Sequence, residues 1–264
     1  MTTYKNLNYR GTLDESIFDK TLAIVGSRRM TRYGESVLDK FMPELVANKV
    51  TIISGFMYGI DTAAHKKCLE LGGKTIAILG NGLDYIYPPE NDKLYKEIIE
   101  KGGLIMSEFD DDFKPTLWSY PQRNKTVAKL STLGILVIEA GLKSGSLVTA
   151  NLGYKMKKKI FAVPGPITSS VSSGTNYLIK SGMAKIVTDV SDILDIKTEF
   201  TQEKLLVDLD NIETKIVKVL KDEELSVDEI CHKTGINISE LSVKLSIMGM
   251  RNILDEKNGK YFLV

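Results

Sequence analysis

The stretch Leu22-Ala23-Ile24-Val25-Gly26-Ser27-Arg28-Arg29 decides the fold class of this chain. An apolar run of β type reaches a glycine that permits a sharp turn, and an amphipathic pattern follows. We therefore predict a strand, a loop and a helix. In an open parallel sheet, ligands bind beyond the carboxyl ends of the strands, where the next helix presents free N–H groups to an anion. Gly26, Ser27 and Arg28 are thus candidate phosphate-binding residues, and a loop with solvated arginines is the alternative.

Arginine is concentrated near this loop. The chain has six arginines among its 35 basic residues, and four of them are Arg28, Arg29, Arg32 and Arg123. A planar guanidinium matches the geometry of a phosphate better than an ammonium group does. The formal net charge of the chain is only +1, so no strong overall field attracts a polyanion. A site for nucleic acid must therefore be a local patch.

Cysteine and histidine are too few and too scattered for a disulfide framework or a zinc site. Cys68 and Cys231 lie far apart, and with His65 and His232 they lack the spacing of metal ligands. The N-terminal sequence MTTYKNLNYRG has no apolar core of signal-peptide length, and no run approaches a membrane span. We expect a cytoplasmic protein with no membrane segment, no metal and no cofactor.

Strands and helices alternate through most of the chain, which predicts a mostly parallel, Rossmann-like sheet with helices on both faces. The expected strands are 21–26, 50–53, 74–79, 104–106, 133–138, 159–163 and 184–187. The expected helices are 33–47, 59–71, 91–101, 121–131, 145–156, 174–182 and 190–195. We divide the chain into a lead-in (1–20), a Rossmann DNA-binding domain (21–195), a charged linker (196–210) and a C-terminal domain (211–264).

The C-terminal domain has the pattern of a winged helix. Three helical segments, 211–221, 226–233 and 238–250, precede a hairpin signal at Asn258-Gly259. Many winged helices bind DNA, but residues 210–264 hold ten acidic and eight basic residues. Because the electrostatic footprint of a DNA reader is missing, a structural or partner-binding role is favoured over reading of the major groove.

Three more glycine-bearing loops follow predicted strands. Ser54 and Gly55 follow the second strand, and Gly80 and Gly82 follow the third. After the fifth strand, Lys143-Ser144-Gly145-Ser146 supplies a charge, two hydroxyls and the N–H groups of a helix start. Each loop alone is a weak signal. Their repetition at one edge of the sheet predicts a shared crevice for a phosphate or a nucleotide-like ligand.

Asp61 and His65 stand four residues apart at the start of the second helix, where a carboxylate can hydrogen-bond an imidazole. They are either an oriented pair that supports the pocket or a helix-start carboxylate and a separate buried histidine. Trp118 and Tyr120 precede Arg123-Asn124-Lys125 at another helix start. Aromatic rings next to cations suit stacked bases and phosphates, whereas simple packing of the loop is the alternative.

Seven ordered blocks resemble one family, the DNA-processing protein A family (DprA, also called Smf). They are IVGSRR, SGFMYGIDTAAH, GNGLDYIYPPEN, PQRN, VIEAGLKSGSLVTA, FAVPG and GTNYLI, and the resemblance covers residues 8–195. The C-terminal segment is similar to the winged-helix domain of that family. The resemblance implies an extended Rossmann fold and a dimer that binds single-stranded DNA, protects it and helps load the recombinase RecA during natural transformation. It implies no enzyme activity.

The resemblance also implies roles for individual residues. Gly26, Ser27 and Arg28 would form the pocket for the DNA backbone, and Lys143 to Ser146 would complete it. Arg123, Asn124 and Lys125 would line its rim, and the stretch Gly174 to Met183 would lie near the dimer surface. Two departures from the family pattern are the short segment of about twenty residues before the first strand and the low net charge.

Two enzyme classes compete with a binding module. The phosphoribohydrolases related to lysine decarboxylases, the LOG type, carry a glutamate on the helix after their glycines. Here Glu139 ends a strand instead, and no Thr-x-x-Glu follows the glycines. A dinucleotide-dependent oxidoreductase needs Gly-x-Gly-x-x-Gly after the first strand, which the sequence Gly26 to Thr31 does not provide. A binding module is therefore favoured.

Overall fold

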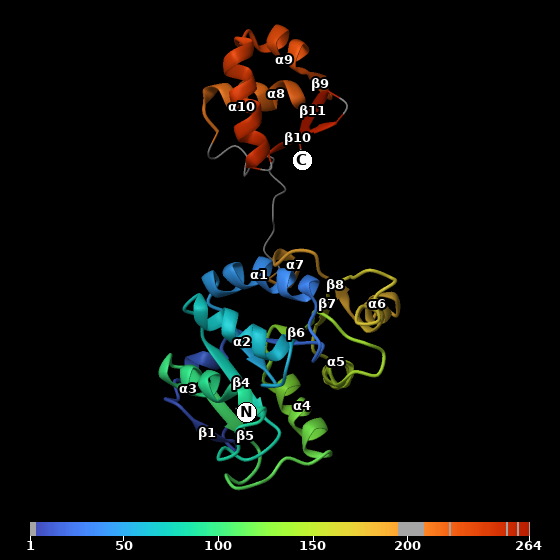
Figure 1. Ribbon diagram of the computed structural model, residues 1–264. Coiled ribbons are helices and arrows are strands. Elements are labelled where there is room, and N and C mark those ends of the chain that lie inside the picture. Colours follow the sequence, from blue (N-terminus) through green and yellow to red (C-terminus); the bar gives the residue numbers. More distant parts are fainter. Residues whose placement is uncertain (1–3, 195–208, 222, 252, 258, 264) are drawn as a thin grey trace. The chain divides into compact units, whose positions relative to one another are not determined.

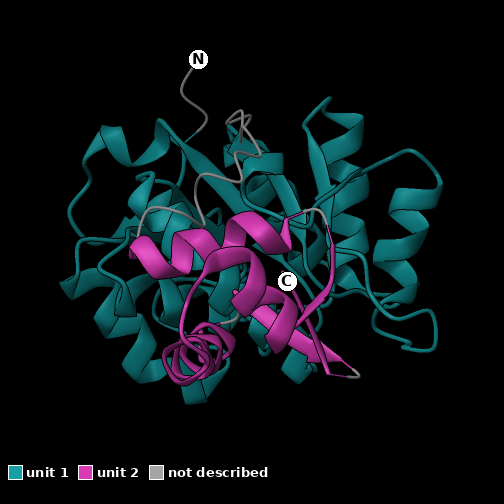
Figure 2. Ribbon diagram, turned by 90° about the horizontal axis from the view of Figure 1, so that it is seen from above, with its two compact units in different colours: residues 1–197 teal, residues 198–264 magenta. Residues whose placement is uncertain are grey.

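The computed structural model describes residues 4–194, 209–221, 223–251, 253–257 and 259–263 (Figure 1). The chain forms two compact units, residues 1–197 and residues 198–264 (Figure 2). Most of the predicted linker, residues 196–208, lies outside the described residues.

The first unit is built on a mixed sheet in which all strands but one are parallel. The strands are β1 (Asn8–Arg10), β2 (Thr21–Val25), β3 (Thr51–Ser54), β4 (Thr75–Leu79), β5 (Leu104–Ser107), β6 (Gly134–Val137), β7 (Ile160–Ala162) and β8 (Lys185–Ile186). Their order is β1-β5-β4-β3-β2-β6-β7-β8. The predicted fold class, a Rossmann-like α/β sheet, is confirmed.

Helices cover both faces of this sheet (Figure 1). They are η1 (Glu15–Phe18), α1 (Arg32–Ala47), α2 (Ile60–Glu70), η2 (Pro89–Asn91), α3 (Asp92–Glu100), α4 (Ser119–Leu130), α5 (Gly145–Lys155), α6 (Ser173–Lys180) and α7 (Ser191–Leu194). The helices α1, α2, α3 and α7 pack on one face, and α4, α5, α6 and η1 pack on the other. The long predicted helices and strands end within two residues of the observed bounds.

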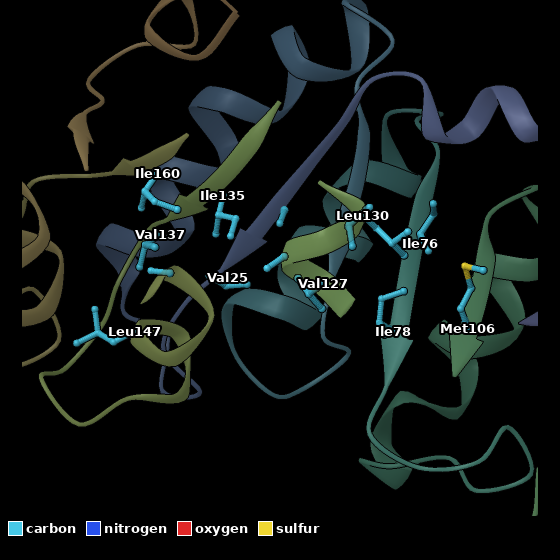
Figure 3. Packing of buried hydrophobic residues seen from close by; sticks show 14 of the residues in the cluster. Val25, Ile76, Ile78, Met106, Val127, Leu130, Ile135, Val137, Leu147 and Ile160 are labelled. Atoms are coloured by element: carbon cyan, nitrogen blue, oxygen red, sulfur yellow. The ribbon is translucent and has the colours of Figure 1, made fainter. Parts of the chain in front are cut away.

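The alternation of side chains along the strands supplies both cores. In β2, Ala23 and Val25 point to the α4–α6 layer, while Leu22 and Ile24 point to the α1–α2 layer. Figure 3 shows the first of these cores, where side chains of the sheet meet those of α4 and α5. Every residue of β2 is buried, which explains its uninterrupted apolar sequence.

The order of the strands reverses at β2. From β2 the chain builds β3, β4 and β5 on one side, and it then returns to place β6, β7 and β8 on the other. The carboxyl ends of β2 and β6 therefore diverge into loops that leave toward opposite faces. In open α/β sheets this switch point is where ligands bind.

Strand β1 was not predicted, because residues 1–20 were assigned to a lead-in. It pairs antiparallel with β5 and forms one edge of the sheet. Arg10 then donates to Asp111 at 2.7 Å and to Asp84 at 3.3 Å, so β1 is tied to the loops that follow β4 and β5. A three-residue strand without apolar alternation leaves no periodic signal in the sequence.

The second unit has three helices and a small antiparallel sheet, the arrangement of a winged helix. The helices are α8 (Asn211–Leu220), α9 (Val227–Thr234) and α10 (Ile238–Met250), and the strands are β9 (Leu225–Ser226), β10 (Leu254–Lys257) and β11 (Lys260–Leu263). β10 and β11 form the predicted hairpin, although Asn258 itself is outside the described residues. Capping boxes at Asp210 and Ser226 start α8 and α9.

Candidate nucleic-acid interface

A cleft of about 630 Å³ lies at the switch point between β2 and β6. It is lined by residues from five separate segments: Val25, Gly26, Ser27, Arg28, Arg29, Gly55, Met57, Asp61, Tyr120, Pro121, Arg123, Asn124, Val127, Lys143, Ser144, Gly145, Ser146, Val148, Thr149, Ser170 and Val171. The fold thus brings together the loops after β2, β3, β6 and β7 and the start of α4. Ten of the predicted binding residues, together with Asp61, meet here.

Two cations stand on the open side of the cleft. Arg28 and Lys143 are both exposed, and no carboxylate of the described residues lies within 4.0 Å of either side chain. The Arg28 guanidinium lies 5.9 Å from the centre of the Tyr120 ring, a cation–π contact that holds it over the cleft. Both cations remain available to an anion.

The N-terminus of α5 faces the same cleft. Ser144 is its N-cap, and the Ser144 Oγ accepts from the Leu147 N–H at 3.4 Å and lies 2.9 Å from the Ser146 Oγ. A side chain at Gly145 would meet no atom within 4 Å, so a ligand can approach the backbone there. The free N–H groups of this first turn favour negative charge.

The N-terminus of α1 does not serve the cleft, although the sequence suggested it as an anion site. The buried carboxylate of Glu139, which follows β6, accepts from the Thr31 N–H at 3.0 Å and from the Thr31 hydroxyl. The Glu139 carboxylate thus occupies the N-terminus of α1, the helix that follows Arg28. The N-terminus of α5, and not that of α1, therefore presents the positive end of a helix dipole to the cleft.

The floor of the cleft contains a buried arginine. Arg123 is only 4% exposed, and its Nη1 donates to the carbonyls of Gly55 and of Ile78, the latter at 2.8 Å. Its Nε donates to the Asn124 Oδ1 at 3.1 Å. The expectation of a rim residue is therefore corrected: Arg123 joins the ends of β3 and β4 beneath the cleft.

Asp61 lies beside this arginine. A Cβ at Gly55 would be 2.5 Å from the Arg123 Nη1 and 2.6 Å from the Asp61 Oδ2, so both groups close around this glycine. Burial raises the pKa of the Asp61 carboxyl, and the Arg123 charge and the Met57 N–H partly oppose this rise. Burial also lowers the pKa of Arg123. Gly55 is required because nothing larger fits between the two.

His65 does not pair with Asp61, which corrects the functional interpretation of that spacing. The His65 Nδ1 lies 2.6 Å from the Thr75 Oγ1, which itself donates to the Ile52 carbonyl at 2.8 Å. The hydroxyl must therefore accept from the imidazole, and Nδ1 carries the proton. His65 is fully buried, and burial lowers its pKa to about 3. It is a neutral core residue outside the cleft.

Four further predicted residues are not in the cleft. The Ser54 hydroxyl is buried and donates to the Ile24 carbonyl at 2.6 Å. Gly80 packs on the Tyr120 ring, and Gly82 packs on the backbone of the loop after β5. Their strand, β4, is two places from β2, about 10 Å away. Lys125 is exposed on α4, but it points outside the cleft lining.

Sequence reasoning left the role of the aromatic residues open. Tyr120 lies between Arg28 and Arg123, with guanidinium-to-centroid distances of 5.9 and 6.0 Å, and it lines the cleft. Trp118 instead packs edge-on against Phe109 and Phe113 and remains 60% exposed. Of the two rings, Tyr120 belongs to the site. Ser170 and Val171 also line it and carried no signal in the sequence.

A larger hollow of about 780 Å³ lies at the opposite ends of the strands, where α1, α2 and α3 end. Two of its three lysines already hold backbone carbonyls, since Lys20 donates to Asn48 and Lys74 donates to Lys101. No group of three His, Cys, Asp or Glu residues in the described part of the chain could hold a metal. Nor is any helix there long and apolar enough to cross a membrane.

The winged-helix unit does not present a basic recognition helix. The single lysine of α10, Lys244, is paired with Asp210 and lies 3.8 Å from Glu213. Val243, Ile247 and Met250 are exposed on the same helix. The helix α10 thus presents exposed apolar side chains and a lysine that is already paired.

The fold and the cleft define a class: Rossmann-like proteins whose sheet has a cleft at its switch point, here with a helix N-terminus and two cations that no described carboxylate pairs. Known proteins narrow this class. The sequence model described as "DNA recombination-mediator protein A" matches residues 4–197, and the chain belongs to this family.

Relatives in several bacteria match part of this chain. Protein Smf of Escherichia coli K12 is 44% identical over 174 residues, which are 66% of this chain and 46% of that protein. The DNA processing protein DprA of Streptococcus pneumoniae is 40% identical over 188 residues, 71% of this chain and 65% of that protein. The chain thus spans about half to two thirds of the length of these curated relatives.

Solved structures agree with this assignment. The crystal structure of DprA from S. pneumoniae has a TM-score of 0.66 at 38% identity, over 72% of this chain and 65% of that one. DNA processing protein A from Helicobacter pylori, whose structure concerns its mode of binding single-stranded DNA, has a TM-score of 0.64 at 34% identity, over 72% of this chain and 85% of that one.

Proposed function

We propose that this chain binds single-stranded DNA, with a backbone phosphate in the cleft between the loop after β2 and the N-terminus of α5. The observation that carries the proposal is the convergence of Arg28, Lys143 and the free first turn of α5 on one cleft. Charge-assisted hydrogen bonds to phosphate are the strongest contacts these groups make. The H. pylori relative with this fold binds single-stranded DNA, which supports the same ligand here.

Arg28→Ala tests the proposal, and Arg32→Ala is its matched control because Arg32 is exposed but does not line the cleft. The loss of one charge-assisted contact, about 1.5 to 3 kcal/mol, weakens binding by about 10- to 100-fold. Fluorescence anisotropy of a labelled oligo-dT measures this. Equal affinities of the two variants would refute the cleft as the binding site.

The family description supports a further step, in which the bound strand is handed to a recombinase of the RecA type. We propose that this chain acts as a mediator of recombination, in natural transformation or in another DNA-handling process. A strand-exchange reaction with RecA and single strands covered by a single-strand-binding protein tests the role. No acceleration of RecA loading by this chain would refute it.

We also propose a homodimer formed through α6 and the edge strand β8. Tyr177 and Ile186 are about half exposed there, at 50% and 47%, and β8 leaves one side of its backbone unpaired in the described part of the sheet. Ile186→Lys places a charge in this surface. Sedimentation equilibrium of the variant and of the parent tests the dimer, and an unchanged mass would refute this interface.

We propose that binding occurs without catalysis. The geometry around Glu139 supports this, because both of its carboxylate oxygens are engaged by Thr31 and the side chain is 1% exposed. A general base needs access to its substrate. Incubation with nucleoside monophosphates tests the alternative of a phosphoribohydrolase, and release of free base would refute the proposal.

A further inference from the structure

Positive charge is concentrated in one segment of the chain. Residues 113–188 contain ten lysines and one arginine but only one acidic residue, Glu139. The segment therefore carries +10, and because the whole chain carries +1, the remainder carries −9. Glu139 is buried and hydrogen-bonded to Thr31, so it does not offset the surface charge of the segment.

The fold collects this segment into one layer. Its helices α4, α5 and α6 all pack on the same face of the sheet. At one end of the α4–α5 pair, the Asn124 amide donates to the Gly145 carbonyl at 3.4 Å. At the other end, the Lys158 ammonium donates to the carbonyls of Lys129 and Ser131. The two helices thus pack against each other.

Lysines line the outer surface of this helix pair. Lys125 and Lys129 are exposed one turn apart on α4, and Lys155 and Lys157 are exposed at the end of α5. No carboxylate of the described residues lies within 4.0 Å of these four ammonium groups. Tyr154, half exposed, directly precedes Lys155 on α5. We call these five residues the α4–α5 face.

The opposite layer is different. Lys93 and Lys96 on α3 pair with Glu97 and Asp92, and Lys67 on α2 pairs with Asp39 and Glu70. These three lysines are balanced by neighbouring carboxylates. The difference between the two layers is invisible in the net charge of the chain.

We propose that a single strand held in the cleft continues along the α4–α5 face, with its phosphates against these lysines and a base against Tyr154. The proposal rests on the proposed function, because the cleft anchors the strand. The 12 residues of α4 span about 18 Å. At about 3.4 Å per phosphate of one strand, the face holds roughly five further phosphates. A charged track with an exposed ring suits single strands of any sequence.

The test replaces Lys125, Lys129, Lys155 and Lys157 together by glutamine. The matched control replaces Lys66, Lys67, Lys93 and Lys96, which lie on the other layer and change the net charge equally. Anisotropy is measured with the dinucleotide dT-dT, whose one internal phosphate fits the cleft, and with an oligo-dT of about 20 nucleotides, which also covers the face.

For the longer strand, the glutamine variant has a shallower slope of log K against log salt than the parent. The difference is up to about 2.8, because each lost lysine–phosphate contact reduces the slope by about 0.7. Between about 0.05 and 0.2 M salt, the affinity of this variant for the longer strand therefore changes about 50-fold less than the affinity of the parent does. The short strand keeps its affinity, and the control variant behaves as the parent. Thermal unfolding of each variant verifies that the fold is intact.

Three results overturn the proposal. The first is an unchanged slope for the longer strand, the second is a loss of affinity for the short strand as large as that for the longer one, and the third is the same loss of affinity in the control variant. A fourth is an equal loss of affinity for a blunt DNA duplex, because the face would then bind any polyanion. The proposed function fails separately, if Arg28→Ala leaves the short strand bound as tightly as before.

Discussion

The most decisive prediction concerns Arg123, because the sequence suggested a DNA ligand and the structure places it in the floor of the cleft. Arg123→Met keeps the length of the side chain but removes the guanidinium. The carbonyls of Gly55 and Ile78 then lose a charged donor, and Asp61 loses the positive charge beside it. All of these groups are buried, so water does not replace the lost interactions.

The magnitude follows from these losses. Each buried acceptor left unpaired costs about 1 to 3 kcal/mol, and an uncompensated buried charge brings the total to about 3 to 5 kcal/mol. For a unit of this size, such a loss lowers the melting temperature by roughly 6 to 20 °C. Arg29→Met, at an exposed position, changes stability by less than about 0.5 kcal/mol.

The assay is thermal unfolding followed by circular dichroism, together with binding of oligo-dT by the folded fraction. Asp61→Asn in the background of Arg123→Met restores part of the stability, because it removes the unbalanced charge. If Arg123→Met unfolds at the same temperature as the parent and only DNA binding is lost, then Arg123 is an accessible ligand and the reasoning is wrong.

Three further predictions concern the same region. Gly55→Ala places a Cβ 2.5 Å from the Arg123 Nη1. The variant should therefore unfold at a lower temperature than the parent in the same assay and bind oligo-dT less tightly. A melting curve like that of the parent would mean that the floor of the cleft can expand. Ser144→Ala removes the N-cap of α5 and should cost about 1 kcal/mol in chemical denaturation, unless water caps the helix as well. The pKa of His65 is about 3 when folded and 6.5 when unfolded, so the unfolded state takes up the proton first and stability falls as the pH falls below 6.5. From about pH 7.5 to pH 5 this loss is about 2 kcal/mol, and denaturation of His65→Gln over the same range should lack it.

The sequence predicted the long helices and the central strands well, because their apolar periodicity is strong. Leu22 to Val25 form a strand as expected, and Lys143 to Ser146 reach the cleft. Short elements without periodicity were missed, as β1 demonstrates. Asp61 and His65 have helical spacing, but spacing alone did not reveal that Thr75 on a neighbouring strand is the partner of the imidazole.

The order of the strands explains most of the remaining differences. Four loops with glycines follow four strands, and the sequence treats them as equal. In the sheet, β2 lies between β3 and β6, whereas β4 lies beyond β3. The loop that holds Gly80 and Gly82 is therefore kept from the cleft by the spacing of the strands.

The sequence by itself determined the class of sheet, the two helix-start loops that carry Arg28 and Lys143, and the family, because these depend on local patterns along the chain. Only the tertiary structure decided which helix end is free for an anion, since Glu139 reaches α1 and leaves α5 open. It also decided that Arg123 is buried and that α4 and α5 pack on the same side of the sheet. Burial and charge neighbourhood depend on residues far apart in the chain, and the fold alone brings those residues together.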